Sequence, residues 1–176
     1  MIPIFVDQYA KIARGFYTVK FDKLGHESWK VLDRQGLQTI RFDRASLKTV
    51  DYARSKGVIG QSYLHGSLYV YLDAADKTPI ITLNKVTKVS PEILASEPYL
   101  QTSRWQVDHL ERAESFIAFR TKGFGMSEMK WIVPQNGRYK VSVNNEEKET
   151  VDVKNHVLEI DLGPSQNEVF HIKASF

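Results

Sequence analysis

The sequence predicts an all-β fold, an antiparallel β-sandwich of jelly-roll type with one short helix at its N-terminal end. From residue 16 onward, apolar and polar residues alternate with a period of two, which is typical of half-buried strands. Gly, Pro, Asn and Asp interrupt these runs about every eight to twelve residues, as in sandwiches and barrels. Only residues 3–15 show helical spacing of apolar side chains, so we expect one helix and about a dozen strands.

The helix is expected over residues 3–15, because Pro3 suits a first turn and Gly15 suits an end. Residues 57–60, the sequence GVIG, are interpreted as a tight apolar turn between glycines. Residues 108–114 and 122–125 are interpreted as a charged and a glycine-rich connection between strands. The expected strands are residues 16–21, 28–32, 38–42, 68–72, 79–83, 99–107, 116–120, 128–133, 139–143, 150–153, 157–162 and 168–174.

The chain of 176 residues is long enough to bury a core, and we expect one sandwich domain over residues 16–176. Residues 1–15 are set apart as the helix. The loop at residues 85–98, which contains two Ser/Glu–Pro steps, is the only plausible internal boundary. Neither side of that loop holds enough predicted strands to close a core comfortably alone.

Composition excludes several classes of function. There is no cysteine, which excludes disulfides, thiolate zinc sites and cysteine catalysis. The net charge of +3, from 24 basic against 21 acidic residues, is too small and too dispersed to indicate nucleic-acid binding. No stretch has the length of a membrane helix, and the start of the chain does not resemble a signal peptide. The protein is therefore either intracellular or a piece of a larger secreted chain.

No catalytic motif is present, and we expect neither a metal nor a cofactor. The five histidines show no metal-ligand spacing, and neither glycine pair has the context of a phosphate-binding loop. Paired carboxylates occur as Glu146 with Glu147 and as Glu111 with Glu114. Because a glycosidase pair must face across a cleft, we interpret these as solvated loop charges.

Aromatic side chains are the remaining candidates for a binding site. Alternation in the 68–72 strand places Tyr69 and Tyr71 on one face and the apolar residues on the other. Trp105 lies between Arg104 and Gln106, next to charged residues, and is expected to be the most exposed tryptophan. Trp131 lies in an apolar run and is expected in the core, which is also the ordinary place for any tryptophan of a sandwich.

A flat indole or phenol ring can bury the apolar C–H face of a sugar while neighbouring polar groups bind its hydroxyls. The candidate glycan-binding residues are therefore Trp105, Tyr69 and Tyr71, followed by Tyr63 and His65 in the loop before the tyrosine strand. An exposed loop residue is the ordinary explanation for His65.

Several segments, in the same order, resemble the region that follows the catalytic barrel in Pel-type exopolysaccharide deacetylases. Residues 9–16 (YAKIARGF) are similar to the segment that leaves the barrel in those proteins. Residues 24–29 (LGHESW) and 34–43 (RQGLQTIRFD) resemble the strands that follow, and residues 53–60, the strand to Leu72 and residues 98–100 continue the order. The resemblance covers most of residues 9–105 and weakens afterwards.

The resemblance implies a secreted or periplasmic parent enzyme that removes acetyl groups from an amino-sugar polymer. The Asp and His metal ligands of that family belong to the barrel and have no counterpart in this sequence, so no catalytic residue is carried over. The chain would be the C-terminal sandwich of such an enzyme, with residues 1–15 a remnant of the barrel. Its partners would be the polysaccharide and the deacetylase domain, with no nucleic acid or membrane.

Three hypotheses follow. The chain is a non-catalytic module that guides an amino-sugar polysaccharide, or a structural domain that buttresses the deacetylase barrel, or a free-standing jelly-roll glycan hydrolase or lyase. An aromatic surface near hydrogen-bond acceptors would favour the first hypothesis. An apolar patch near residues 1–16 would favour the second, and a cleft between carboxylates the third.

Overall fold

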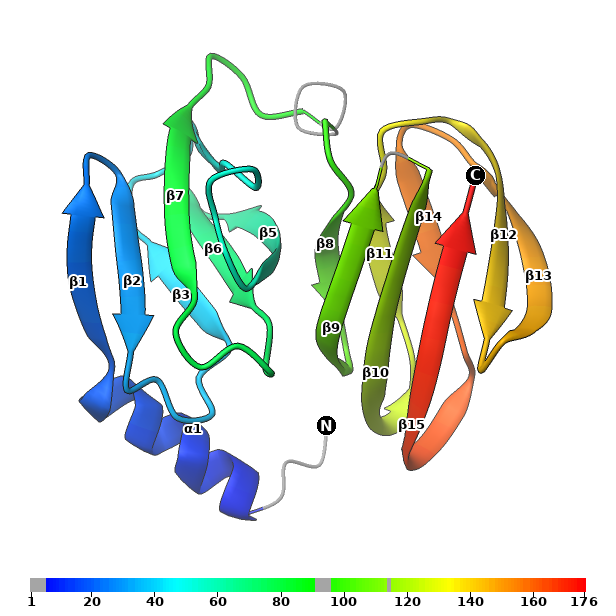
Figure 1. Ribbon diagram of the computed structural model, residues 1–176, viewed down its shortest axis with the longest axis horizontal. Coiled ribbons are helices and arrows are strands. Elements are labelled where there is room, and N and C mark those ends of the chain that lie inside the picture. The colour runs from blue at the N-terminus through cyan, green and yellow to red at the C-terminus, as the bar shows by residue number, and fades with distance from the viewer. Residues whose placement is uncertain (1–5, 91–95, 114) are drawn as a thin grey trace. The chain divides into compact units, whose positions relative to one another are not determined.

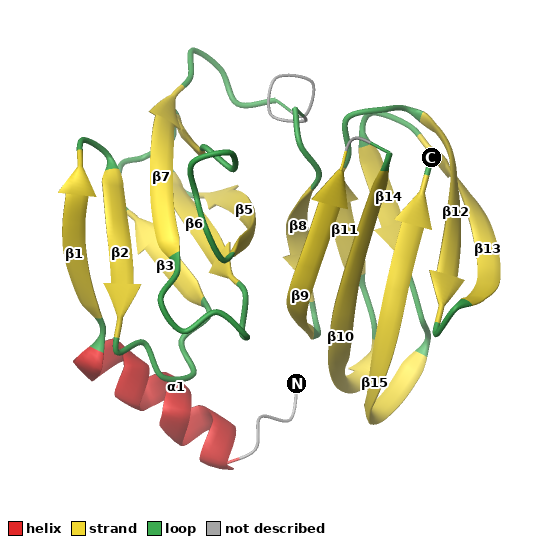
Figure 2. Ribbon diagram, viewed as in Figure 1, coloured by secondary structure: helices red, strands yellow, loops and turns green. Residues whose placement is uncertain are grey.

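The computed structural model describes residues 6–90, 96–113 and 115–176, and the structural statements that follow concern those residues. The protein is mostly β, with 60% strand and 6% helix, which confirms the predicted all-β class (Figure 2). The chain divides into two compact units, Met1–Thr87 and Lys88–Phe176, called here the N-terminal and C-terminal units. The division lies inside the 85–98 loop, and each unit has its own buried apolar residues. The strands of each unit belong to two of the three sheets. The assignment of residues 16–176 to one domain stays a prediction.

The single helix of the described residues, α1 (Val6–Thr18), extends past the expected end at Gly15. Gly15 is buried against the carbonyl of Arg34 and the side chain of Leu37, so its lack of a side chain serves packing rather than termination. The helix ends at Thr18, whose hydroxyl oxygen lies 2.5 Å from the carbonyl oxygen of Asp33 and 3.0 Å from that of Arg14, so its single hydrogen is shared between these two acceptors. Because the helix runs further than predicted, the first strand begins at Lys20 rather than at residue 16.

The N-terminal unit contains seven strands in two antiparallel sheets (Figure 1). The first sheet has the order β1-β2-β7-β4, and in the second β6 lies between β3 and β5. The strands are β1 (Lys20–Gly25), β2 (Ser28–Leu32), β3 (Thr39–Phe42), β4 (Lys48–Val50), β5 (Val58–Leu64), β6 (Ser67–Leu72) and β7 (Ile80–Lys85).

Two of these strands were not predicted. The apolar GVIG segment leads into β5, which begins at Val58, rather than forming a turn, and β4 lies between the expected strands 38–42 and 68–72, where no strand was expected. Gln61 explains part of this difference, because its buried amide oxygen accepts a hydrogen bond from the backbone N–H of Val50, 2.8 Å away. A side chain distant in the sequence thus satisfies the backbone of the short β4 strand.

The C-terminal unit contains eight described strands, again in two antiparallel layers. One layer has the order β13-β12-β15-β10-β9, and in the other β11 lies between β14 and β8. The strands are β8 (Tyr99–Ser103), β9 (Gln106–Ala113), β10 (Phe116–Met126), β11 (Met129–Ile132), β12 (Gly137–Val143), β13 (Glu146–Val153), β14 (Val157–Ile160) and β15 (Pro164–Ser175).

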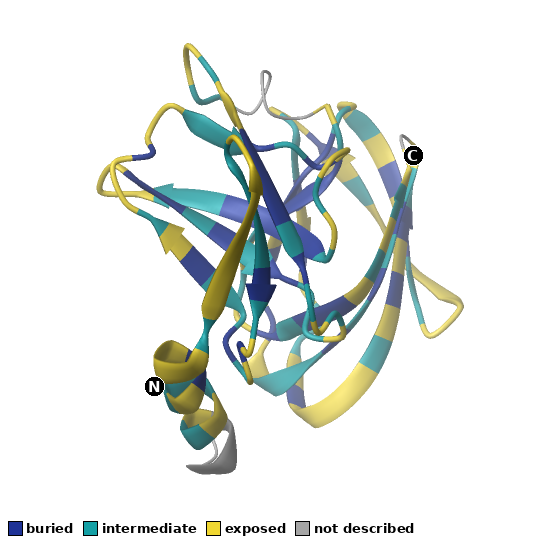
Figure 3. Ribbon diagram, turned by 60° about the vertical axis from the view of Figure 1, so that its left-hand side comes forward, coloured by how far each residue is buried: buried dark blue, intermediate teal, exposed yellow. Residues whose placement is uncertain are grey.

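Residues 108–113 of the charged segment belong to β9, and the glycine-rich 122–125 segment belongs to β10, so both predicted connections are wrong. Residue 114 lies outside the described residues. β9 is the outer strand of its layer, where polar side chains reach solvent without breaking the ladder. Buried and exposed residues alternate along strands of both units (Figure 3). In the C-terminal unit, the rings of Phe119 in β10 and Trp131 in β11 meet between the layers, 4.7 Å apart. Trp131 is fully buried, as predicted.

Candidate functional site

Alternation along β6 separates a phenol-bearing face from the core, as the sequence predicted. Leu68, Val70 and Leu72 are fully buried, whereas Tyr69 and Tyr71 point the other way and are half-buried. Side chains two residues apart on a strand are separated by about 6.8 Å, so the two phenol rings are neighbours. We call this surface, with Arg41, Ser62 and Ser67 beside it, the tyrosine face.

The register of the flanking strands determines which side chains surround the two rings. Tyr71 lies opposite Gly60 on β5, which has no side chain to cover the ring, and Tyr69 lies opposite Ser62. The Tyr71 hydroxyl and the Ser62 hydroxyl share a hydrogen bond of 2.5 Å. This bond holds the hydroxyl end of the Tyr71 ring in place. The faces of the two phenol rings are then the part of this surface that can contact a ligand.

A polar edge accompanies Tyr69. Arg41 on β3 is directly opposite Tyr69 in the register. Its guanidinium donates from Nε to the Ser67 hydroxyl, at 3.0 Å, and from Nη2 to Asp43 Oδ1, at 2.9 Å. The Ser67 hydroxyl in turn donates to Asp43 Oδ1, at 3.1 Å. The tyrosine face therefore combines two aromatic rings with an ordered cation and carboxylate. Such a surface can bind a ligand by stacking and hydrogen bonding.

Tyr63 and His65 do not join the tyrosine face. Tyr63 lies in β5 rather than in a loop, and in the register it pairs with Leu68 on the core-facing side. Its hydroxyl donates to the carbonyl of Lys48, at 2.7 Å, and burial raises the pKa of the Tyr63 hydroxyl. His65 and Gly66 form the exposed two-residue turn between β5 and β6, both with positive φ. The structure supports the ordinary explanation of His65 as a turn residue.

The prediction that Trp105 is exposed is wrong. Its side chain is only 4% accessible, and its ring stacks on Phe170 with the ring centres 5.7 Å apart. A side chain at Gly123 would collide with the indole, so this glycine makes room for Trp105 against β10. The charged neighbours misled the prediction because they flank a turn whose central side chain points inward. A buried indole cannot stack on a sugar, and Trp105 is not part of the candidate site.

The C-terminal unit has an acidic groove that the sequence did not reveal. Its volume is about 560 Å³, and it lies over β11, β13 and β14. The charged residues that line the groove are Glu128, Lys130, Glu149, Asp152, Glu159 and Asp161. Glu159 accepts a hydrogen bond from Lys130, at 2.7 Å, and this bond raises the pKa of the Lys130 ammonium. Carboxylates on β13 and β14, and next to the ends of β11 and β14, converge here, so only the folding of these strands together brings them near one another.

Neither carboxylate pair noted in the sequence faces a partner across a cleft in the part of the chain that the structure describes. Glu146 and Glu147 are exposed on β13, and Glu111 is exposed on β9. Glu114 lies outside the described residues. The acidic groove, rather than these neighbours in sequence, is therefore the place where carboxylates gather.

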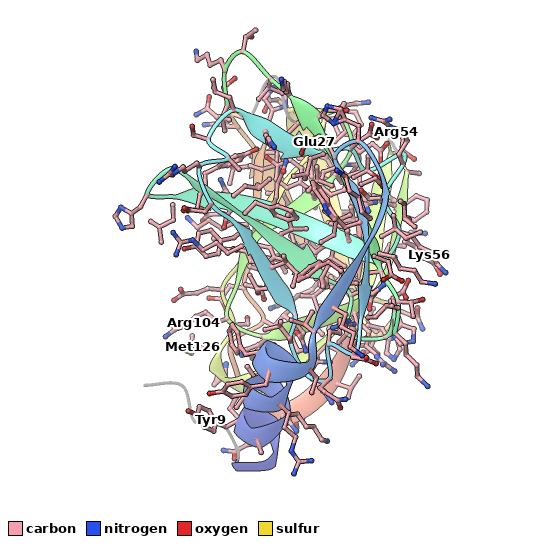
Figure 4. The ribbon with its side chains drawn as sticks, turned by 90° about the vertical axis from the view of Figure 1, so that its left-hand side faces the viewer. Tyr9, Glu27, Arg54, Lys56, Arg104 and Met126 are labelled. Atoms are coloured by element: carbon pink, nitrogen blue, oxygen red, sulfur yellow. The ribbon has the colours of Figure 1, made fainter. Side chains whose placement is uncertain are left out.

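The helix α1 carries an exposed aromatic stripe made of Tyr9, Phe16 and Tyr17. Tyr9 and Phe16 are seven residues apart and so lie on the same side of the helix. Their accessible fractions are 65% and 68%, and that of Tyr17 is 92%. Tyr9 lies on the outside of the helix (Figure 4), whereas Gly15 packs against the 34–37 segment. Three large exposed rings on a short helix form an apolar surface that no described residue of the N-terminal unit covers.

Within residues 6–90, 96–113 and 115–176, no group of three or more His, Cys, Asp or Glu side chains is arranged to hold a metal ion. No helix in the part of the chain that the structure describes is long and apolar enough to span a membrane. Comparisons with protein-family models, with curated proteins and with solved structures found no match to this chain.

Proposed function

We propose that the chain is a non-catalytic β-sandwich module that binds an amino-sugar polysaccharide, as part of a secreted or periplasmic deacetylase. The observation that carries the proposal is the pair of neighbouring phenols on the tyrosine face, Tyr69 and Tyr71, both half-buried and backed by a buried apolar row. The two rings offer a flat apolar platform, and Ser62, Arg41 and Asp43 offer hydrogen-bonding groups at its edge.

The size of the site implies weak binding for each sugar contact. One aromatic contact contributes about 0.5–1.5 kcal/mol beyond its buried area. Two rings with a few hydrogen bonds then give a dissociation constant on the order of 1 mM for an oligosaccharide, which corresponds to roughly 4 kcal/mol. Such affinity is sufficient for a module that holds a long polymer through repeated contacts.

The acidic groove supports the assignment of an amino-sugar polymer. Deacetylation exposes a primary amine, which is protonated at neutral pH, so the product carries positive charge. Three of the groove's five carboxylates form ion pairs, Glu159 with Lys130, Glu128 with Arg104 and Asp152 with Arg138, and the other two, Glu149 and Asp161, are exposed. Only one of these three cations, Lys130, lines the groove, so its lining is mainly acidic. Charge attraction in this groove favours the deacetylated chain over the acetylated one.

The proposal is tested by titrating isotope-labelled protein with partly deacetylated hexosamine oligomers and following backbone amide shifts. We expect saturable shifts at β6. Tyr69→Ala and Tyr71→Ala should each lower the affinity for the oligomer by about three- to ten-fold. The matched control is Tyr17→Ala, which removes an exposed tyrosine from α1 and should leave the affinity unchanged. Shifts that are absent at millimolar oligomer, or equally weakened by Tyr17→Ala, would contradict the proposal. New reducing ends in the same samples would instead identify a glycan hydrolase.

The exposed aromatic stripe favours a second candidate, a structural domain that buttresses a deacetylase barrel. Apolar rings exposed on one helix face are typical of a surface that contacts another domain. If this candidate is correct, a separately produced barrel domain of a Pel-type deacetylase should form a complex with the chain. The double variant Phe16→Ser/Tyr17→Ser should abolish that complex. Tyr69→Ala is the matched control. A barrel that does not bind the unaltered chain excludes this candidate.

A further inference from the structure

A hollow of about 490 Å³ lies on the outer face of the β12–β15–β10–β9 layer. Its lining is mainly basic and polar, unlike that of the acidic groove. Strand register explains why it forms. Ala118 on β10 lies between Glu111 on β9 and Lys173 on β15, and Ser142 on β12 follows in the same row. A methyl group in the middle of a row of longer side chains leaves a depression above the sheet.

Basic and hydrogen-bonding side chains surround this depression. The next row places Arg120 directly opposite His171, with His109 on the β9 side and Asn145 on the β12–β13 turn. The turn is held against β15 because Asn144 Oδ1 accepts a hydrogen bond from the N–H of His171, at 2.9 Å, and the N–H of Asn144 donates to the His171 carbonyl. Among the described residues that line the hollow, only Glu111 carries a carboxylate.

A buried carboxylate beneath the hollow orients two of the lining side chains. Asp108, whose side chain is 7% exposed, accepts hydrogen bonds from His109 Nδ1 at 2.8 Å and from Arg120 Nε at 2.7 Å. Gln106 Nε2 donates a third, at 3.0 Å. Burial raises the pKa of Asp108, but the hydrogen bonds from Arg120, His109 and Gln106 outweigh it, and the net pKa is lowered. Asp108 therefore remains ionised and fixes the imidazole with Nδ1 as donor, which leaves Nε2 for a ligand.

A β-bulge makes this arrangement possible. Asp108 pairs with Arg120 and Glu111 pairs with Ala118, so two residues of β9 stand opposite the single residue Phe119. At the bulge His109 has a φ of 54°, which is uncommon for a residue other than glycine. The extra residue brings Asp108, His109 and Glu111 to one side of the strand, which a regular strand would not do.

We propose that this hollow is a pH-dependent binding site for a compact oxyanion, the phosphate, sulfate or carboxylate group of a small molecule. Lys173 and Arg120 supply permanent positive charge, while Asp108 and Glu111 offset it. When the imidazoles are neutral, Nε2 of His109 is an acceptor and repels an anion. When they are protonated, it becomes a donor, and the hollow gains positive charge at both His109 and His171.

Other charged groups on the same face act on both imidazoles. Lys122 extends the row of β10, and Lys140 of β12 lies beside Glu147 of β13, with Nζ and Oε2 4.0 Å apart. The Nζ of Lys173 lies 5.3 Å from the centre of the Phe116 ring. Lysine and glutamate side chains ordinarily keep their charge between pH 8 and pH 5.5, whereas histidine is the side chain type that changes charge in this interval. The two histidines therefore determine how binding changes between pH 8 and pH 5.5. The site lies in a different unit from the tyrosine face and does not depend on the proposed glycan function.

The test uses the full chain and three probes, sodium sulfate, inorganic phosphate and D-glucuronate, with D-glucose as the neutral control. Amide shifts of β9, β10 and β15 are followed at pH 5.5 and pH 8.0. We expect saturable binding of at least one oxyanion that is about ten-fold or more tighter at pH 5.5, because histidine is the side chain type that changes charge between pH 5 and 8 and a protonated imidazole donates to an anion. The probe that binds tightest identifies the oxyanion. Equal affinity at the two pH values, or no saturable shift with any of the three probes, would overturn the proposal.

Variants separate the roles of the side chains. His171→Gln should weaken binding at pH 5.5 several-fold without disturbing Asp108, whereas Glu111→Gln should strengthen it because it removes the exposed carboxylate. The matched control is His26→Gln, an exposed turn histidine of the N-terminal unit that should have no effect. Asp108 is a positioning residue, so Asp108→Asn should shift the pH at which binding develops. Circular dichroism checks that each variant is folded. A loss with His26→Gln equal to that with His171→Gln would refute the site.

Discussion

The backbone of Gly123 in β10 lies directly against the indole of Trp105, which precedes β9. A Cβ built at Gly123 would overlap the Cδ1 and Cγ atoms of that indole, and Phe170 stacks on the same ring. The closeness of β10 to a buried tryptophan therefore depends on the absence of one methyl group.

We expect Gly123→Ala to lower the free energy of unfolding by about 1–3 kcal/mol, because the added methyl group must displace the packed indole. The backbone of Gly123 is not in the left-handed region, so the effect measures packing alone. Gly25→Ala is the matched control, since a Cβ there meets no atom within 4 Å and should change stability by less than about 0.5 kcal/mol. Urea-induced unfolding provides the measurement, and equal stability of the two variants would contradict this account.

Arg34 connects two loops of the N-terminal unit through buried hydrogen bonds. Its guanidinium donates to the carbonyls of Leu37, at 2.7 Å, of Asp73, at 2.6 Å, and of Asp76, and the residue is only 4% accessible. Burial lowers the pKa of Arg34, but arginine remains charged.

Arg34→Lys should therefore cost about 2–3 kcal/mol of unfolding free energy, because an ammonium cannot reproduce the planar fork. The matched control is Arg44→Lys, whose side chain is 96% exposed and should be neutral in the same thermal or urea titration. If both variants unfold at the same urea concentration, the planar guanidinium of Arg34 is not what holds the two loops together.

Gln61 links β5 to β4. Its Oε1 accepts from the Val50 N–H at 2.8 Å, and its Nε2 donates to the Thr49 hydroxyl at 2.7 Å. We expect Gln61→Leu to cost about 1–3 kcal/mol, since a buried donor loses its acceptor. The opening free energy that hydrogen exchange measures at the Val50 amide should fall by the same amount. Gln38→Leu, at a half-buried position of the same unit, serves as the control, and unchanged exchange at Val50 would rule out the link.

Glu27 should make stability depend on pH. Both of its carboxylate oxygens lie 2.8 Å from Lys48 Nζ, and this hydrogen bond lowers the pKa of Glu27. A lowered carboxylate pKa stabilises the fold above the pKa of the unfolded chain, and this stability is lost as pH falls through the folded pKa. The stability difference between wild type and Glu27→Gln should thus be about 0.5–1 kcal/mol near pH 7 and vanish at strongly acidic pH. Asp22→Asn, on the exposed β1 strand, is the control. A difference that persists at pH 2 would show that the side-chain shape, not its charge, matters.

Local patterns were sufficient for much of the fold. The alternation in residues 68–72 correctly predicted which side chains of β6 are buried, because a strand needs only its own period to separate two faces. The prediction that Trp131 is buried succeeded for the same reason, since its neighbours Ile132 and Val133 are also apolar. The same local reasoning placed Tyr69 and Tyr71 together, and these are the residues that remain in the candidate site.

Glycine and charge misled the prediction where distant residues decide the structure. Gly60 and Gly123 look like turn residues, but they lie within strands, because one is opposite the Tyr71 ring and the other contacts Trp105. The polar 108–114 segment looks like a turn, yet residues 108–113 lie in the outer strand β9, which has a bulge opposite β10. Tyr63 was expected beside the tyrosines, but β5 turns its side chain towards Lys48.

The sequence by itself therefore predicted the fold class and the two faces of β6, because each depends on residues close together in the chain. Composition alone excluded cysteine chemistry, since the chain has no cysteine. The acidic groove, the hollow around Ala118 and the burial of Trp105 depend on the register between strands that are far apart in sequence. Strand register follows from the packing of whole layers rather than from any single segment. These features consequently become visible only once the chain is folded.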